Sequence, residues 1–403
     1  MGWRERWGLA PTGLPRATGP RVWFHAASVG EMVAAQPIVR ALLEIRPDAD
    51  VVVSVVTPGG HETARGMVGK GVSAAFYAPF DVPPAVRRTL RAVRPAVLVL
   101  METELWPNLI HLTRATGARL LTVNGRISDR SIGRYLRAKH VFRWVLGSMD
   151  RVLTQTPRDA ERFVQIGADP SRVEVVGNSK FDQAPERPDA QGVARLKADL
   201  GLEPGAPVLV VGSTRTASEE RIVLEAYCQL RQTAPDLALV HAPRHVERAA
   251  EVVEAMRRVG LSPVRRTEGP HAQGQVRQLV LDTFGELAGV YAVADVAFIG
   301  NSLTPPGGGQ NLLQPLAHGK PVLFGPHMQN FRDLAEMALL DEVGLAVSDA
   351  ASLVAATRGL LEDAQRRGRL ADRATALVER NRGAALRYAA EIARALPPVT
   401  DAA

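Results

Sequence analysis

The chain has 403 residues, of which 46% are hydrophobic and 23% charged, a composition typical of a soluble globular protein long enough for two domains. Its apolar runs have the length of strands and fall short of a membrane span, and a single cysteine, Cys228, excludes a framework of intrachain disulfides. The formal charge of +7 is concentrated, because residues 114–151 hold nine Lys or Arg and only two acidic residues, which favours an anionic partner.

The first 21 residues are basic and rich in proline and glycine, with Trp3 and Trp7 among them. This composition favours a flexible arm, whereas tryptophan beside arginine also suits the headgroup region of a membrane. No segment has the pattern of a signal peptide or of a transmembrane helix. We therefore expect a chain without a membrane span.

From residue 21 to residue 178, strand and helix patterns alternate. Strands are expected at RVWFHAAS, DVVVSVVT, PAVLVLMETE, ARLLTVNG, RVLTQT and RVEVVGN. Helical segments such as EMVAAQPIVRALLEIRP and WPNLIHLTRATG lie between them. Continuous apolar strands separated by helices are typical of a parallel sheet covered on both faces.

Residues 185–206 are rich in proline and glycine and predict a linker. A second alternation follows, with strands expected at VLVVGS, LALVHAP, QLVLDTF, VYAVADVAFIG and PVLFGP and a helical, arginine-rich tail from about residue 351 to residue 395. We therefore expect an α/β protein with two facing, doubly wound domains, residues 1–184 and 207–403, and a cleft between them.

In open α/β sheets, ligands bind beyond the carboxyl ends of the strands, so the loops that follow strands hold the candidate site. Glu31 follows the first strand and begins a helix, where it either faces the expected cleft or simply complements the helix dipole. Glu102 and Glu104 follow another strand, and their spacing of two predicts one shared face. Lys180 follows a third strand, in a chain that otherwise uses mainly arginine.

In the second half, Ser213, Thr214 and Ser218 lie at a turn from strand to helix. That position suits phosphate binding or, with Ser218 as the cap, ordinary helix capping. Arg244 follows Pro243 past the end of the next strand, and its guanidinium could donate two hydrogen bonds to a phosphate. The alternative interpretation is an ordinary surface arginine.

The strongest local signal is PPGGGQNLLQP, residues 305–315. Three glycines follow a strand, and Gln310, Asn311 and Gln314 then begin a helix. Glycines let the backbone approach a ligand closely, and their N–H groups can form an anion nest. The spacing matches neither the dinucleotide fingerprint nor the P-loop, so we expect a ligand loop of another kind.

Within the basic segment, apolar residues recur at helical spacing between Arg130, Arg134, Arg137 and Arg143. Core packing explains part of this pattern, and arginines beside aromatic residues also suit an anionic lipid surface. The sequence contains no recognised nucleic-acid-binding motif and no His/Cys cluster at ligand spacing. Neither nucleic acid nor a bound metal is expected.

Six motifs, in one order, resemble those of the bacterial 3-deoxy-D-manno-octulosonic acid (Kdo) transferases of lipid A core assembly. They are WFHAASVGEM, METELWPN, NGRISDRS, GNSKFD, APRHVER and PPGGGQNLLQPLAHGKPVLFGPHMQNF, and the resemblance spans about residues 20–335. It implies the GT-B fold, with two Rossmann-like domains. It also implies inverting, metal-independent transfer of Kdo from CMP-Kdo to a lipid A precursor (lipid IVA), with no cofactor.

The same resemblance implies roles for individual residues. Glu31 would be the general base, and Glu102, Glu104 and Lys180 would support the reacting centre. With Ser213, Gly309 and Gln310 added from the loops above, the expected CMP-sugar site also includes Pro243, Arg244, Phe284, Gly285, Glu286, Leu287, Asn311, Leu312, Leu313 and Gln314.

The chain departs from the family pattern at Gln310 and Gln314, where the family usually has His and Glu; glutamine still donates and accepts hydrogen bonds but carries no charge. The N-terminal hydrophobic anchor common in the family is expected to be missing from this sequence, either because it was removed or because this version binds the membrane peripherally. We expect the chain as given to bind peripherally at the cytoplasmic face of the bacterial inner membrane. Two alternatives remain open. One is another GT-B enzyme, such as a nucleotide-sugar epimerase or UDP-sugar transferase, and the other is a nonenzymatic nucleotide- or lipid-binding protein.

Overall fold

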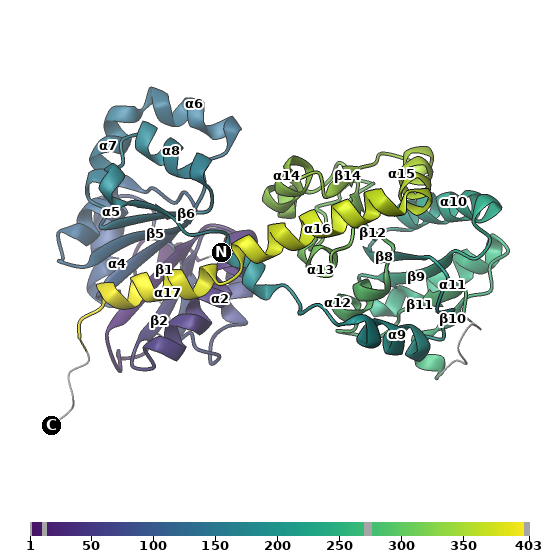
Figure 1. The fold of residues 1–403 in the computed structure, drawn as a ribbon. Helices are drawn as coiled ribbons and strands as arrows, with labels where there is room; N and C mark the ends of the chain where they lie inside the picture. The colour runs from purple at the N-terminus through teal and green to yellow at the C-terminus, as the bar shows by residue number, and fades with distance from the viewer. Residues whose placement is uncertain (1, 10–13, 270–275, 399–403) are drawn as a thin grey trace. The chain divides into compact units, whose positions relative to one another are not determined.

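The computed structural model describes residues 2–9, 14–269 and 276–398, which form two compact units. The first unit is Met1–Gln183 with Asn381–Ala403, and the second is Ala184–Arg380. Each unit is built on one parallel sheet of seven strands with helices packed on it (Figure 1). The expected α/β fold with two doubly wound sheets is confirmed.

The sheet of the first unit has the order β3-β2-β1-β4-β5-β6-β7. Its strands are β1 (Arg21–Ala26), β2 (Asp50–Val55), β3 (Ala74–Tyr77), β4 (Val97–Met101), β5 (Arg119–Gly125), β6 (Arg151–Thr154) and β7 (Val173–Val175). Its helices are α1 (Trp3–Arg6), α2 (Val29–Ile45), α3 (Pro58–Arg65), α4 (Pro83–Val93), α5 (Pro107–Arg114), α6 (Asp129–Arg137), α7 (Lys139–Gly147), α8 (Pro157–Gln165) and α17 (Ala384–Ala395), with 3-10 turns η1 (Pro170–Arg172) and η2 (Ser179–Gln183). The strand order reverses between β1 and β4, so the loops after these two strands flank the position where such sheets bind ligands.

Both faces of this sheet are covered. Val22 and Phe24 of β1 belong to an apolar cluster on one face, and Trp23, between them, belongs to a cluster on the other. Every residue of β1, β2 and β4 is buried. Burial on two faces explains why these strands appear in the sequence as continuous apolar runs without polar alternation.

The sheet of the second unit has the order β10-β11-β9-β8-β12-β13-β14. Its strands are β8 (Val208–Thr214), β9 (Ala238–Pro243), β10 (Val264–Arg265), β11 (Gln278–Val280), β12 (Val296–Ile299), β13 (Val322–Phe324) and β14 (Gly344–Ala346). Its helices are α9 (Ala190–Asp199), α10 (Ala217–Thr233), α11 (Ala249–Arg258), α12 (Leu287–Val290), α13 (Leu313–Ala317), α14 (Arg332–Leu340), α15 (Ala350–Glu362) and α16 (Ala364–Asn381), with 3-10 turns η3 (Val246–Arg248), η4 (Arg266–Glu268), η5 (Tyr291–Val293) and η6 (Gln329–Phe331). Here the order reverses between β8 and β12, whose loops therefore flank the second expected ligand position.

The end of the chain lies in the first unit, so the assignment of residues 207–403 to one domain was wrong. Helix α17 packs against α2 (Figure 1), and Tyr388 is fully buried in the core of the first unit. The Tyr388 hydroxyl donates to the Gly177 carbonyl at 2.6 Å, and the Asp182 carboxylate accepts from the N–H of Ala385 at 2.7 Å. The helical pattern of the tail predicted the helix but carried no information about which core its apolar face covers.

The stretch 185–206, expected to be a linker, is also more than a connection. It contains α9, which belongs to the second unit and packs near η5. The first part of the first unit ends at Gln183, and α9 begins at Ala190, so the irregular segment that connects them is short.

The segment before β1 is docked on the first unit over residues 2–9, so the flexible-arm expectation is wrong there. Glu5 accepts from the N–H of Tyr77 at 2.8 Å, and the Arg6 guanidinium lies 4.7 Å from the centre of the Tyr77 ring. Trp3 and Trp7 both contact the edge or face of Phe80. Within the described ranges, every helix is too short or too polar to cross a membrane.

Candidate active site

The first group of predicted site residues lies in the first unit, where β1 ends and α2 begins. Ser28 caps α2, and Glu31 lies in its first turn with only 8% of its surface exposed. The Glu31 carboxylate accepts from the N–H of Ala27 at 2.7 Å and from the Ser28 hydroxyl at 2.9 Å. The loop and the helix cap therefore hold the Glu31 carboxylate at the edge of the sheet. A residue that only complemented the helix dipole would not need these two hydrogen bonds.

Two further carboxylates follow β4 and act electrostatically on Glu31. Burial raises the pKa of Glu31 well above its ordinary value, and the negative charges of Glu102 and Glu104 raise it further. Burial also raises the pKa of Glu104 to about 7. The hydrogen bond from the Trp106 indole N–H lowers this pKa, and the negative charge of Glu102 raises it. Three carboxyl groups this close do not all ionise freely near neutral pH, so the cluster is suited to holding and exchanging protons.

Lys180 completes this cluster from η2. Its ammonium lies 3.7 Å from a Glu102 carboxylate oxygen, and its side chain is largely buried. The neighbouring Ser179 fixes η2, because its hydroxyl donates to the Ala34 carbonyl of α2 at 2.8 Å and its N–H donates to the Asn124 side chain at 3.1 Å. The structure therefore gathers the four residues predicted from the first half into one site.

Sequence reasoning missed three residues that border these carboxylates. His25 of β1 has its Nε2 atom 3.7 Å from a Glu104 oxygen, and Trp106 donates to the same carboxylate. Tyr135 of α6 has its pKa raised by burial and by the charge of Glu104. A histidine inside the otherwise apolar strand RVWFHAAS was the signal that could have identified His25.

Helices α6 and α7 present a basic and apolar face, here called the α6–α7 surface. Its exposed members are Arg134, Leu136, Arg137, Lys139, Val141, Arg143 and Trp144. Leu136, Val141 and Trp144 are each between 42% and 51% exposed, which is high for apolar side chains. Asp129 is engaged by Arg158 and Arg162, so it does not neutralise the cations of this surface. The side chain of Arg130 lies outside the described residues.

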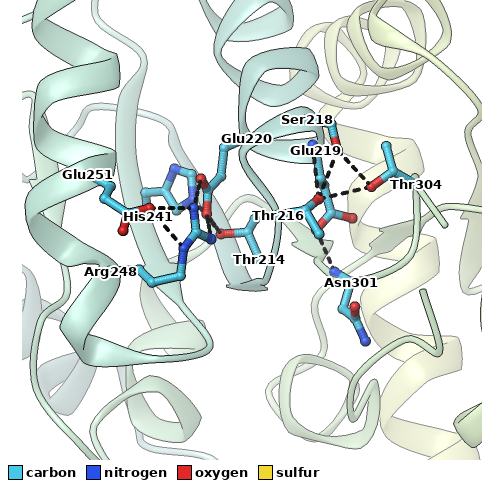
Figure 2. Close-up of polar contacts among 10 residues, drawn as sticks. All are labelled: Thr214, Thr216, Ser218, Glu219, Glu220, His241, Arg248, Glu251, Asn301 and Thr304. Carbon is cyan, nitrogen blue, oxygen red and sulfur yellow. Dashed lines mark hydrogen bonds and ion pairs between the residues drawn. The ribbon is translucent and has the colours of Figure 1, made fainter. Parts of the chain in front are cut away.

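A second group of predicted site residues follows β8 in the second unit. Ser213 is buried with φ 63°, a left-handed conformation that bends the chain as the strand ends. The cap of α10 is Thr216, whose hydroxyl accepts from the N–H of Glu219, so Ser218 is not the cap. The Ser218 and Thr216 hydroxyls instead reach Thr304 in the loop after β12 (Figure 2).

Glu219 ties the loop after β12 to α10. Its buried carboxylate accepts from three consecutive N–H groups, those of Asn301, Ser302 and Leu303, at 2.6, 2.8 and 2.9 Å. Figure 2 shows Glu219 pointing from α10 toward Asn301. The anion nest in this unit is therefore made by residues 301–303, and a protein carboxylate occupies it.

The glycine loop itself does not present the nest that the sequence predicted. The Gly308 N–H donates to the His327 carbonyl at 3.0 Å and the Gly309 N–H to the Asn301 carbonyl at 2.7 Å. A Cβ atom on Gly308 or Gly309 would lie within 2.5 Å of Asn330 or Met328. These glycines are required because the loop packs closely against residues 327–330. The Gly308 amide stabilises that packing, and the Gly309 amide joins the loop to Asn301.

A second buried network connects the ends of β8 and β9 (Figure 2). Thr214 contacts His241 at 2.9 Å and donates to Glu220 at 3.1 Å, and Arg248 binds Glu220 with two hydrogen bonds. Burial lowers the pKa of His241 to about 3, so the ring is neutral. The network fixes the turn that follows β9, where Pro243 is buried and Arg244 is exposed.

The other predicted donor-site residues divide into exposed and buried groups. Phe284 is 93% exposed at the tip of a turn, Gly285 has φ 89°, and Glu286 pairs with Arg266. Leu287 begins α12. Gln310, Asn311 and Gln314 are partly exposed, and the Asn311 side chain accepts from the N–H of Leu313 at 3.0 Å. Leu312 and Leu313 are buried, so their side chains support this loop from inside the unit.

Comparison with known proteins places these features in a family context. The family described as 3-deoxy-D-manno-octulosonic-acid transferase (kdotransferase) matches residues 1–183. The 3-deoxy-D-manno-octulosonic acid transferase of Bordetella pertussis is 35% identical over 95% of this chain and 89% of its own length. The enzyme of the same name from Haemophilus influenzae is 30% identical over 90% of this chain and 84% of its own length.

Among solved structures, the glycotransferase of kitacinnamycin superposes with a TM-score of 0.57. It covers 95% of this chain and all of its own, at 16% identity. This likeness concerns the fold. In the part of the chain that the structure describes, no three His, Cys, Asp or Glu side chains are grouped so that they could hold a metal ion.

Proposed function

This chain belongs to the 3-deoxy-D-manno-octulosonic acid transferase family and has the GT-B fold of glycosyltransferases, and from that premise we propose that it transfers Kdo from CMP-Kdo to a lipid A precursor (lipid IVA) with inversion at the anomeric carbon. The observation that carries the proposal is the carboxylate cluster of Glu31, Glu102 and Glu104 beside Lys180. It lies at the strand-order reversal of the first sheet, where α/β enzymes bind substrates.

Glu31 is the proposed base. A sugar hydroxyl is a weak nucleophile near neutral pH, and a carboxylate beside it takes the proton as the new bond forms. The hydroxyl oxygen attacks the anomeric carbon, its proton passes to Glu31, and the bond to the CMP phosphate breaks. One displacement of this kind inverts the anomeric configuration. Lys180 beside Glu102 offsets part of the negative charge that raises the pKa of Glu31.

The second unit supplies the proposed donor site. Arg244 is exposed past the end of β9 and has two donors for the phosphate of CMP, whose departure it would favour electrostatically. Ser213, the turn at residues 284–287 and the loop at residues 309–314 border the same edge of this sheet. With Arg244 in the charge-neutralising role, we propose a reaction that needs no bound metal and no cofactor. The partly exposed Gln310 and Gln314 would bind ribose hydroxyls without charge.

The proposed reaction is tested by incubating the full chain with CMP-Kdo and a tetraacylated lipid A precursor. We expect product masses larger than the acceptor by one or more Kdo units, together with release of CMP. A UDP-sugar in place of CMP-Kdo serves as the control and is expected to give no product. A chain that binds CMP but yields no Kdo-bearing lipid would contradict the proposal and favour a nonenzymatic binding protein.

We further propose that the α6–α7 surface binds the anionic face of the membrane that holds the acceptor, at the cytoplasmic side of the inner membrane. Exposed tryptophan and leucine beside arginine suit the headgroup region. The charge of Glu104 raises the pKa of Tyr135 on α6, so this helix is within electrostatic range of the carboxylate cluster.

Reversing charge on this surface tests the membrane proposal. Each basic residue near an anionic membrane contributes about 1 kcal/mol, so the triple change Arg134→Glu, Arg137→Glu, Arg143→Glu is expected to weaken vesicle binding at least 100-fold. Binding is measured by sedimentation with phosphatidylglycerol vesicles. A matched control reverses three exposed arginines of α16, Arg366, Arg369 and Arg373, and is expected to bind as the parent chain does. Equal losses in both triple variants would contradict a specific role of the α6–α7 surface.

A further inference from the structure

The next-to-last residue of β1 is a fully buried histidine whose two nitrogens face different partners. His25 is paired in register with Ser54 of β2, and its Nδ1 lies 2.9 Å from the Ser54 hydroxyl oxygen. On its other side, Nε2 lies 3.7 Å from a Glu104 oxygen, and the ring meets Trp106 edge-on at 4.7 Å. Nε2 has no hydrogen-bond partner among the described residues.

The hydrogen bonds of Ser54 decide where the proton of this ring lies. The Trp23 indole N–H, which can only donate, donates to the Ser54 oxygen at 2.8 Å. If Nδ1 also donated to that oxygen, the serine's own hydrogen would have no acceptor among the residues that the structure describes. With Ser54 donating to Nδ1, all three groups are satisfied. The single proton of the neutral imidazole is then on Nε2, the atom that faces Glu104.

We propose that His25 is a positioning residue for Glu104, held by Trp23 and Ser54 in the tautomer that directs an Nε2–H toward the Glu104 carboxylate. The inference rests on the proposed function only in that Glu104 belongs to the reacting centre. The 3.7 Å separation is longer than a hydrogen bond, and contacts of this kind often shorten when the substrate binds. Together with the Trp106 N–H, His25 would then give the ionised Glu104 two fixed donors.

The surrounding charges explain why such a donor matters. Glu102, just after β4, and Glu31 of α2 act electrostatically on Glu104, Tyr135 of α6 is influenced by its charge, and Lys180 lies beside Glu102. Burial raises the pKa of Glu104 to about 7, so a donor aimed at its oxygens shifts the balance between the protonated and the ionised carboxyl near neutral pH. Burial lowers the pKa of His25 to about 3, so the imidazole remains neutral. It therefore acts on Glu104 only through the orientation of its Nε2–H and not through a positive charge.

The tautomer is measured directly by ¹⁵N NMR of the full chain with labelled histidine. The chain has nine histidines, and the His25 signals are assigned from their loss in the His25→Gln variant. We expect a neutral ring at pH 8 with the proton on Nε2, and a change of tautomer or a mixture in Ser54→Ala, which keeps the ring in place. A proton on Nδ1, or a charged ring at pH 8, would overturn the inference. This result does not depend on transferase activity.

The effect on Glu104 is measured by ¹³C titration of labelled glutamate carboxyls. Loss of the Nε2–H that is directed at the ionised Glu104 carboxylate is expected to raise the Glu104 pKa by up to about one unit in His25→Phe, with the parent value restored in His25→Gln, whose amide N–H replaces Nε2–H. The control is His61→Gln, which changes a partly buried histidine of the same unit and is expected to leave the Glu104 titration unchanged. If the transferase is active, the acidic limb of its pH profile moves by the same amount. An unchanged Glu104 titration in both His25→Phe and Ser54→Ala would refute the proposal, whereas a shifted titration in an inactive chain would refute only the proposed function.

Discussion

Replacement of Glu31 by glutamine is expected to lower turnover at least about 100-fold while the protein stays folded, because glutamine fills the same space but takes no proton from the acceptor. The glutamine oxygen can accept from the N–H of Ala27, and its amide can donate to the Ser28 hydroxyl, so both contacts of Glu31 have a replacement. Turnover is measured with CMP-Kdo and the lipid acceptor at saturating concentrations.

The matched control is Glu44→Gln, an exposed glutamate on the same helix, which is expected to keep parental turnover. Near-normal turnover in Glu31→Gln would remove Glu31 from the role of base. A loss of equal size in both variants would indicate damage to α2 rather than to the chemistry.

The raised pKa of Glu31 also predicts how stability depends on pH. Between the ordinary carboxyl pKa and the raised value, the folded chain binds more protons at this position than the unfolded chain does. The contribution of Glu31 to the free energy of unfolding therefore falls as pH rises through that window and stays low above it. Glu31→Gln has no such loss, so at pH 8 it should be at least as stable as the parent chain. Such a trade-off between stability and activity is typical of functional sites.

The largest expected loss of stability follows from Glu219. Glu219→Ala leaves the three N–H groups of residues 301–303 buried without an acceptor, at a cost of about 1–3 kcal/mol each, so the free energy of unfolding of this unit should fall by roughly 3 kcal/mol or more. Glu219→Gln keeps one acceptor oxygen and should lose less. Urea unfolding measures both variants.

Two further measurements distinguish the role of Glu219 from general destabilisation. Glu225→Ala changes an exposed glutamate on the same helix, and its effect is expected to stay within about 0.5 kcal/mol. In Glu219→Gln, amide hydrogen exchange should increase at residues 301–303 and the KM for the CMP-sugar should rise. Parental stability of Glu219→Ala would show that these amides find other acceptors.

The sequence was informative where a signal is local. Val- and Leu-rich runs predicted the central strands, and acids directly after two strands predicted the cluster at the end of β1 and β4. The strands β3, β10 and β14 were missed, because AAFY, VR and GLA are short and lack the Val- and Leu-rich runs that marked the other strands.

The remaining errors concern contacts between distant segments. Nothing in GGG indicates that the amides of Gly308 and Gly309 bind His327 and Asn301 instead of a ligand. Likewise, an acid pair at a helix start is usually a capping feature, and only the structure shows Glu219 occupying the amides of residues 301–303. Such pairings depend on tertiary packing, which no local pattern encodes.

The return of α17 to the first unit has a consequence for how the protein is made. Because Tyr388 and its neighbours complete a core that begins with β1, the first unit lacks one of its layers until α17 has been synthesised. The second unit is encoded between the two parts of the first unit and contains all strands of its own sheet, so its core can be complete earlier. Until α17 emerges, the side of α2 that it covers stays exposed to solvent, as expected for a folding intermediate with exposed apolar surface.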